Sequence, residues 1–173
     1  MGVNMVGNCI MDDDACKDAS NQEIIRRYYT SLAELAAGAS SEDAAYKIEL
    51  LMKQAHITTE DRKVVSAALK RAEETNAPAA AMELNDGRMI LGKTSNLLGA
   101  SAALVLNALK ELAGLDHELH VISPEAIEPI QRLKVAYLGS KNPRLHTDEV
   151  LIALSMSAAS NPAAQKALEQ IPE

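Results

Sequence analysis

Apolar residues recur at helical spacing in three successive stretches of the first half of the chain. The first stretch follows Ser20, which has the spacing of a capping box with Glu23, and it ends at Gly38. The other two stretches each begin after a Ser or Thr cap, and the loops between them are short. Because short loops favour antiparallel packing of neighbouring helices, residues 1–76 are predicted to form a three-helix unit.

The pattern changes after Pro78, where strand-like sequence replaces the helical period. The segments "AAAMEL" (79–84) and "RMILGK" (88–93) flank Asn-Asp-Gly, which tolerates the positive φ angles of a tight hairpin turn. A long apolar helix is predicted next, from about residue 96 to 113, with Thr94 or Ser95 as its cap. These signals predict a β-hairpin followed by a helix.

The remaining segments predict one more strand and three capped helices. The segment "ELHVIS" (118–123) is predicted to be a third strand, and its last residue, Ser123, caps the next helix. Thr147 and Asn161 are the predicted caps of the last two helices. The fold class is therefore α+β, with residues 77–173 forming a second, α/β subdomain in the order hairpin, helix, strand and helices.

Residues 87–94 match the phosphate-binding P-loop pattern, with Gly87, four variable positions, Gly92, Lys93 and Thr94. The four middle residues, "RMIL", are large and favour a strand, whereas a phosphate cradle needs small residues whose backbone can curl. Gly87 is also needed to close the predicted turn. ATP hydrolysis at this motif is therefore disfavoured, and Lys93 is interpreted as an ordinary lysine at a strand end.

Composition and charge exclude several classes of partner. The 173 residues are 47% hydrophobic and 24% charged, as in a globular protein. The formal charge of −7 and the absence of Phe and Trp argue against nucleic-acid binding. No apolar run reaches the roughly 18 residues of a membrane span and no secretion signal is visible, so a cytoplasmic location is expected. Cys9, Cys16 and the acids at 12–14 lack matching ligands, so neither a metal nor a cofactor is expected.

The loop over residues 139–149 is the strongest candidate site. Its cationic and amide side chains precede a helix whose exposed backbone N–H groups attract anions, and a histidine and an aspartate could move a proton. The alternative is that residues 147–149 are the ordinary polar residues of a first helical turn. A second such terminus follows the predicted hairpin. The candidate ligand-binding residues are Lys141, Asn142, Arg144, Thr94 and Ser95, and the candidate catalytic residues are His146 and Asp148.

The order hairpin, helix, strand and helix resembles that of cytidine-deaminase-type domains, which implies a three-layer α/β subdomain. Those domains carry Pro-Cys-x-x-Cys after the strand, whereas this chain has Glu125 and Glu128 after Pro124. The preceding helix also offers no Cys or His beside a Glu. Because thiolates and imidazole hold the zinc that activates water, the resemblance implies the fold without deamination.

A more extensive resemblance rests on "GVNMVGNCI", "DGRMILGKTS", "LLGASAALVLNALK" and "ISPEAIEPIQRLK". These segments resemble the C-terminal part of a bacterial family described as domain of unknown function 1846. The resemblance implies a longer protein with a further N-terminal α/β region, of which this chain is a fragment or truncated member, and a sheet that is incomplete here. It supplies no activity and no catalytic residues.

Two functional hypotheses follow. The first is a noncatalytic binding or assembly module that forms a homo-oligomer or packs against the N-terminal region of its own family. The second is part of an enzyme that binds a small anionic or nucleotide-like ligand at the 139–149 loop.

Overall fold

The computed structural model describes residues 12–172 and is α+β, with seven α-helices and a two-stranded antiparallel sheet in this range. The chain divides into two compact units, residues 1–63 and 64–173. The sequence places the boundary near residue 76, at the end of helix α3 (Lys63–Thr75), whereas this division falls at the start of that helix. The third predicted helix thus belongs to the second unit by its contacts.

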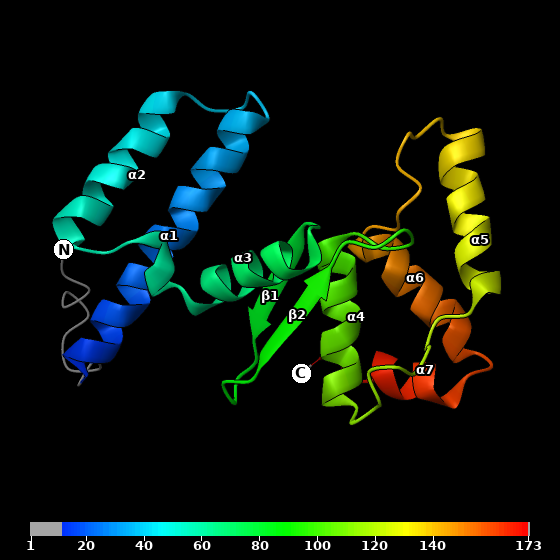
Figure 1. The fold of residues 1–173 in the computed structure, drawn as a ribbon. Coiled ribbons are helices and arrows are strands. Elements are labelled where there is room, and N and C mark those ends of the chain that lie inside the picture. The colour runs from blue at the N-terminus through cyan, green and yellow to red at the C-terminus, as the bar shows by residue number, and fades with distance from the viewer. Residues whose placement is uncertain (1–11, 173) are drawn as a thin grey trace. The chain divides into compact units, whose positions relative to one another are not determined.

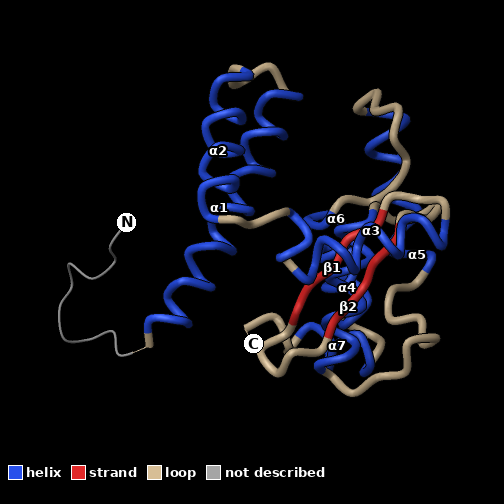
Figure 2. Tube along the Cα trace, turned by 60° about the vertical axis from the view of Figure 1, so that its left-hand side comes forward, coloured by secondary structure: helices blue, strands red, loops and turns tan. Residues whose placement is uncertain are grey.

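The first unit is a helical hairpin of α1 (Asp13–Ala36) and α2 (Glu42–Ala55), which lie side by side in both views (Figures 1 and 2). Gly38 follows α1 in the left-handed region, with φ of 71°, as expected for a residue that ends a helix. The core is small. Its buried residues are Ile25, Ser31, Ala45 and Met52.

The predicted start of the first helix, after Ser20, is wrong. The helix begins at Asp13, because the Asp12 carboxylate accepts a hydrogen bond from the backbone N–H of Ala15 at 2.9 Å and so caps the helix earlier. Ser20 lies inside the helix, and its hydroxyl donates to the backbone carbonyl of Cys16 at 2.8 Å. The acids at 12–14 therefore stabilise a helix start.

In the second unit, strands β1 (Ala79–Glu83) and β2 (Met89–Lys93) form the predicted hairpin, with Ala81 opposite Leu91. The backbone N–H of Leu84 donates to the Arg88 carbonyl at 2.9 Å, and Gly87 has φ of 84°. The hairpin is confirmed. The middle of the P-loop match is therefore a paired strand, which leaves no curled backbone to surround a phosphate.

Helix α4 (Ala100–Leu112) packs on the hairpin (Figures 1 and 2). A Cβ atom at Gly92 would clash with the backbone nitrogen of Leu104 and the backbone oxygen of Ala100. The second glycine of the P-loop match is thus explained by close approach of helix and strand.

The predicted third strand at residues 118–123 is wrong. The sheet has two strands, and in the described chain the segment between α4 and the next helix pairs with neither. The segment starts with a turn, in which the Asp116 carboxylate accepts a hydrogen bond from the N–H of Glu118 at 2.8 Å. Val121 and Ile122 are then both buried, so consecutive side chains enter the core instead of alternating.

Three further helices complete the second unit: α5 (Pro124–Arg132), α6 (Thr147–Ala158) and α7 (Pro162–Leu168). Ser123 and Asn161 occupy the predicted cap positions, whereas His146 replaces Thr147 as the cap of α6. A five-residue π-helical turn extends α5. The main core joins α4 to these helices, and its buried residues are Ala102, Leu109, Val121, Ile122, Ala126, Leu145, Val150, Ala153, Leu154, Ala164 and Ala167. The α+β class is confirmed, and the three-layer deaminase-like arrangement is not.

Candidate functional site

The two loops that the sequence singles out separately lie together in the second unit. Leu98 and Leu145 form an isolated parallel bridge, in which the N–H of Gly99 donates to the Leu145 carbonyl at 3.1 Å. The N–H of Leu145 donates in turn to the Leu97 carbonyl at 2.8 Å. Leu145 is fully buried and anchors the contact. The loop after β2 therefore reaches the start of α6, as Figure 1 shows.

This bridge places the first turns of α4 and α6 next to each other. The Thr147 hydroxyl donates to the Ser101 hydroxyl at 3.3 Å, which joins the two turns directly. Because the bridge is parallel, both helices present their amino-terminal ends to the same region. The unpaired N–H groups and partial positive charges of two helix ends thus add together at one place.

Ser95 has a different role from the predicted helix cap. Helix α4 starts at Ala100 with Gly99 as its cap, and not near residue 96. The Ser95 hydroxyl instead accepts hydrogen bonds from the backbone N–H groups of Leu97 and Leu98, at 3.2 and 3.0 Å. It therefore folds the loop that carries the bridge.

Arg144 connects the two loops through its side chain. Its Nε–H donates to the backbone carbonyl of Ser95 at 2.7 Å, and its own backbone N–H donates to the Asn142 side-chain oxygen at 3.1 Å. No acceptor for the two terminal nitrogens of Arg144 is recorded among residues 12–172. The guanidinium is thus held through its Nε–H, and its two terminal nitrogens can donate hydrogen bonds to a ligand.

A nearly buried ion pair supports the loop from beneath. Lys134 Nζ donates to the Arg144 backbone carbonyl at 2.7 Å and to a Glu149 carboxylate oxygen at 2.8 Å. Burial opposes ionisation of Glu149, but the hydrogen bonds from Lys134 and the His146 backbone outweigh it and lower the pKa of the carboxyl. The carboxylate is therefore charged near neutral pH and fixes the backbone on which Arg144 sits.

The two predicted catalytic residues are not paired with each other. The backbone N–H of His146 donates to the Glu149 carboxylate at 2.7 Å, and His146 stands at the cap position of α6. The ring Nε2 of His146 lies 3.4 Å from the Asn142 side-chain nitrogen. Over the described part of the chain, no hydrogen bond joins His146 to Asp148. His146 thus occupies the cap position of α6, and its backbone is tied to Glu149 and not to Asp148.

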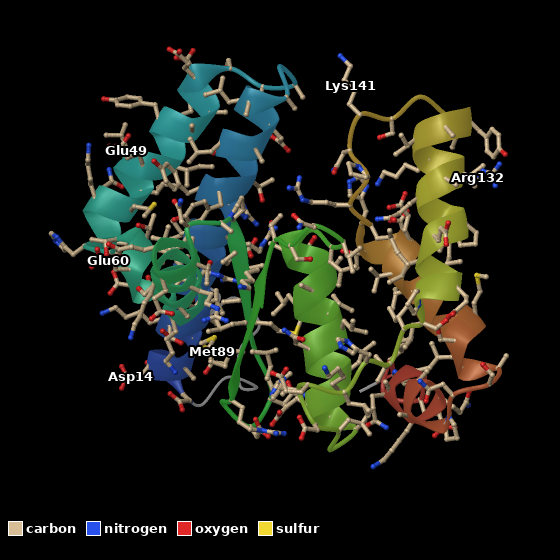
Figure 3. The ribbon with its side chains drawn as sticks, turned by 45° about the vertical axis from the view of Figure 1, so that its right-hand side comes forward. Asp14, Glu49, Glu60, Met89, Arg132 and Lys141 are labelled. Carbon is tan, nitrogen blue, oxygen red and sulfur yellow. The ribbon has the colours of Figure 1, made fainter. Side chains whose placement is uncertain are left out.

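The predicted lysine ligand does not point at the shared helix ends. Figure 3 shows Lys141 projecting from the outer bend of its loop, away from the helices. Thr94 is half-buried, and its backbone N–H donates to the Pro78 carbonyl at 2.8 Å, which extends the hairpin ladder. Of the predicted ligands, the structure brings Arg144, Asn142 and Ser95 together.

A polar cleft of about 640 Å³ beside β2 was not predicted from the sequence. Arg88 pairs with Glu111 of α4, whose other oxygen lies 3.3 Å from His117 Nε2, and the Asn107 amide donates to the Leu91 backbone carbonyl at 2.8 Å. Asn107 and Glu111 are four residues apart on the mainly apolar helix α4, so both lie on one face. That polar pair is the signal by which the sequence could have revealed the cleft.

The described residues contain neither a metal-binding cluster nor a membrane-spanning helix. From residue 12 to 172, no three side chains of His, Cys, Asp or Glu gather as a metal-binding group. No helix in the same range combines the length and apolar character that a membrane crossing requires. Cys9 lies outside the described residues, and Cys16 carries a free thiol.

Comparison with known families follows the two-part division of the chain. The family model described as "Domain of unknown function DUF1846, C-terminal" matches residues 60–173, which include the site described above. The model described as "Domain of unknown function DUF1846, N-terminal" matches residues 1–56. The chain belongs to the DUF1846 family. Membership of the family is therefore confirmed. The resemblance placed the whole chain in the C-terminal part, whereas the helical hairpin falls in the N-terminal family domain.

Relatives in this family are bacterial and considerably longer. A UPF0371 protein of Corynebacterium glutamicum is 56% identical over 99% of this chain and 34% of its own length. A UPF0371 protein of Corynebacterium aurimucosum is 57% identical over the whole chain and 35% of its own length. UPF0371 protein SUB1165 of Streptococcus uberis is 53% identical over 99% of the chain. The chain thus spans about a third of the length of these relatives.

Proposed function

We propose that this chain is a noncatalytic binding module of a longer cytoplasmic protein, and that it holds a small anion where the amino ends of α4 and α6 meet. The observation that carries the proposal is the position of Arg144, which spans the two loops at that place. A guanidinium beside two helix amino ends offers directed N–H donors and positive charge to one ligand.

Binding without catalysis is favoured by what the acid–base residues already do. Glu149 accepts hydrogen bonds from Lys134 and from the His146 backbone N–H, which lower the pKa of its carboxyl and hold it charged. Among residues 12–172 no hydrogen bond joins His146 to Asp148, so these groups do not form a proton relay at this place.

A single phosphate or carboxylate group fits this place better than a whole nucleotide. The residues that would surround a nucleotide's phosphates are paired in β2, and Gly92 is covered by α4. Asp148, exposed in the first turn of α6, limits how much negative charge the place can accept.

The test is calorimetric titration of inorganic phosphate into the chain and two single variants. Arg144→Gln should weaken phosphate binding about tenfold, since it removes a charge-assisted donor. Lys141→Gln removes the same charge from the same loop, but that side chain projects away, so binding should change by less than about twofold. Equal weakening by both variants would point to general attraction and contradict the site.

The same titration with ATP and adenosine tests the P-loop pattern. ATP is expected to bind no more tightly than phosphate, and Lys93→Ala is expected to leave ATP binding unchanged. A nucleotide-specific signal that Lys93→Ala abolishes would contradict the interpretation of residues 87–94 as hairpin.

A second candidate function, assembly, is favoured by the surface of the helical hairpin. Its large apolar side chains are exposed to an unusual extent for so short a segment. They are Tyr29, Leu32, Tyr46, Leu50 and Leu51, with exposed fractions from 36% to 56%. We propose that the rest of the N-terminal family domain covers them, or a second copy of this chain where that domain is lacking.

Light scattering of the chain in solution tests the assembly proposal. If a second copy covers the hairpin, the chain should be dimeric, and Leu50→Lys with Leu51→Lys should make it monomeric. The matched control replaces two exposed apolar residues of the second unit, Ile152→Lys with Met156→Lys. A dimer that only the control disrupts would move the interface to α6.

A further inference from the structure

An apolar cavity of about 430 Å³ lies in the second unit. Its walls come from the loop before α4, α4 itself, the unpaired segment before α5, and α5. Its apolar lining includes Leu98, Leu106, Leu119, Ile122 and Ile127. The volume lies within the range of small-molecule sites in proteins, which are mostly apolar with a few polar groups.

One charged side chain in this cavity, Lys110, is nearly buried. It is 5% exposed, and its Nζ donates to the backbone carbonyl of His117. Burial lowers the pKa of Lys110, which the more distant carboxylates of Glu118 and Asp116 partly oppose. An ammonium group has three donors, and here one neutral carbonyl is its recorded partner among the described residues.

The other buried lysine of the second unit shows what is missing. Lys134 is 7% exposed, and it is paired with the Glu149 carboxylate at 2.8 Å. No such carboxylate partner is recorded for Lys110 over residues 12–172. Buried charges in proteins are normally paired, so a ligand carboxylate would supply the counter-charge that Lys110 lacks.

We propose that this cavity binds a small aliphatic carboxylate, with its chain against the leucine and isoleucine walls and its carboxylate at Lys110. The remaining charged or titratable side chains of the lining, His120 and Glu128, are exposed and can stay hydrated. The Glu128 carboxylate can therefore stay in water when the ligand binds, and two carboxylates do not have to be buried together. The cavity is apolar along its length and cationic at one buried point, which is the complement of such a ligand.

The test compares decanoate with decanol, which have the same chain length and differ in charge, as ligands of the chain in solution. Calorimetry below the aggregation concentration of either compound should give decanoate at least about tenfold the affinity of decanol. Lys110→Met keeps the side-chain volume and removes the charge, so it should abolish this preference while decanol still binds. Lys166→Met, an exposed lysine of α7, should leave both affinities unchanged.

A further variant locates the chain of the ligand. Leu106→Phe narrows the cavity without touching the charge, so it should weaken decanoate and decanol together. If Lys110→Met fails to fold, Leu106→Phe still tests whether the ligands bind in this cavity. Equal affinity of the unaltered chain for the two compounds would overturn the proposal. Absence of binding of both compounds would also overturn the proposal. This holds even if the chain forms a dimer whose second copy covers the cavity.

Discussion

The two units of the chain are built differently, although both are rich in helix. The second unit buries a continuous cluster in which α4, α6 and α7 meet, with Leu154 and Val150 fully enclosed. The first unit buries few side chains and leaves Tyr46 and Leu51 at least half exposed. The helices of the first unit therefore depend for their stability more on caps and local ion pairs than on packing.

The family matches follow the same division. They end at residue 56 and resume at residue 60, close to the division of contacts between 63 and 64. We propose that the two units are separate domains joined near residues 57–63. The comparison shows that one short chain can combine a unit with a continuous buried core and a unit that leaves much of its apolar surface exposed.

The largest expected difference between the two units is the loss of unfolding free energy when a leucine is truncated. Leu154→Ala opens a cavity in the second unit, where the side chain is fully buried, and should cost about 2–5 kcal/mol of unfolding free energy. Leu50→Ala in the first unit removes a side chain that is 39% exposed and should cost less than about 1 kcal/mol. Urea unfolding followed by hydrogen exchange assigns each loss to its unit. Equal losses would mean that the hairpin is packed in solution as tightly as the second unit.

The next effect concerns charge in the second unit. Glu149→Gln leaves the buried Lys134 without its carboxylate and should cost about 1–3 kcal/mol at pH 7, reduced because Glu149 keeps some exposure. The folded-state pKa of Glu149 is lowered, so its stabilisation is present above the unfolded value and is lost as pH falls through the folded value. Urea unfolding at a series of pH values should show the variant's deficit shrinking on acidification.

An exposed carboxylate of the first unit gives the control for this pH series. Hydrogen bonds from Arg26 and Arg27 lower the pKa of Glu23 to about 2, although its side chain is 41% exposed and the pair lies at the surface. Glu23→Gln should leave the unfolding of the second unit unchanged at every pH. A deficit of Glu149→Gln that stays constant down to pH 3 would contradict the role assigned to the ion pair.

Local signals in the sequence predicted the parts of the fold that are locally determined. The hairpin follows from Asn85-Asp86-Gly87, because that turn needs φ above zero at its glycine and its hydrogen bonds stay within a few residues. Asn161 is a predictable cap for the same reason, because its side chain accepts from the nearby N–H of Ala163, and Ser123 stands at its predicted cap position without such a bond. The first helix shows the limit of this approach, because Asp12 offered an earlier cap than Ser20.

Contacts distant in sequence could not be predicted this way. The strand pattern of residues 118–123 was overridden because Val121 and Ile122 are both buried against helices. Likewise, the sequence pattern places Arg144 and Ser95 near the amino-terminal ends of two different helices. Their hydrogen bond depends on the bridge at Leu145, which no local period reveals.

The smallest predicted effect is the loss of stability when one helix cap is removed from each unit. Asp12→Ala removes the carboxylate that accepts from Ala15, and Asn161→Ala removes the equivalent acceptor for Ala163 at the start of α7. Each should cost about 1 kcal/mol. The consequences should differ, because α7 is held by its fully buried Ala164 and Ala167, whereas the first turn of α1 is exposed.

Hydrogen exchange of single amides distinguishes these outcomes. In Asp12→Ala, the amides of the first turn of α1, including Cys16, should exchange faster while the rest of the helix is unchanged. In Asn161→Ala, exchange along α7 should rise only with global unfolding of the second unit, since packing and not the cap keeps that helix in place. Asp18→Ala, a change at a non-capping position of α1, is the matched control. Fraying of α7 alone would show that its packing is weaker than its burial implies, and would narrow the contrast between the two units.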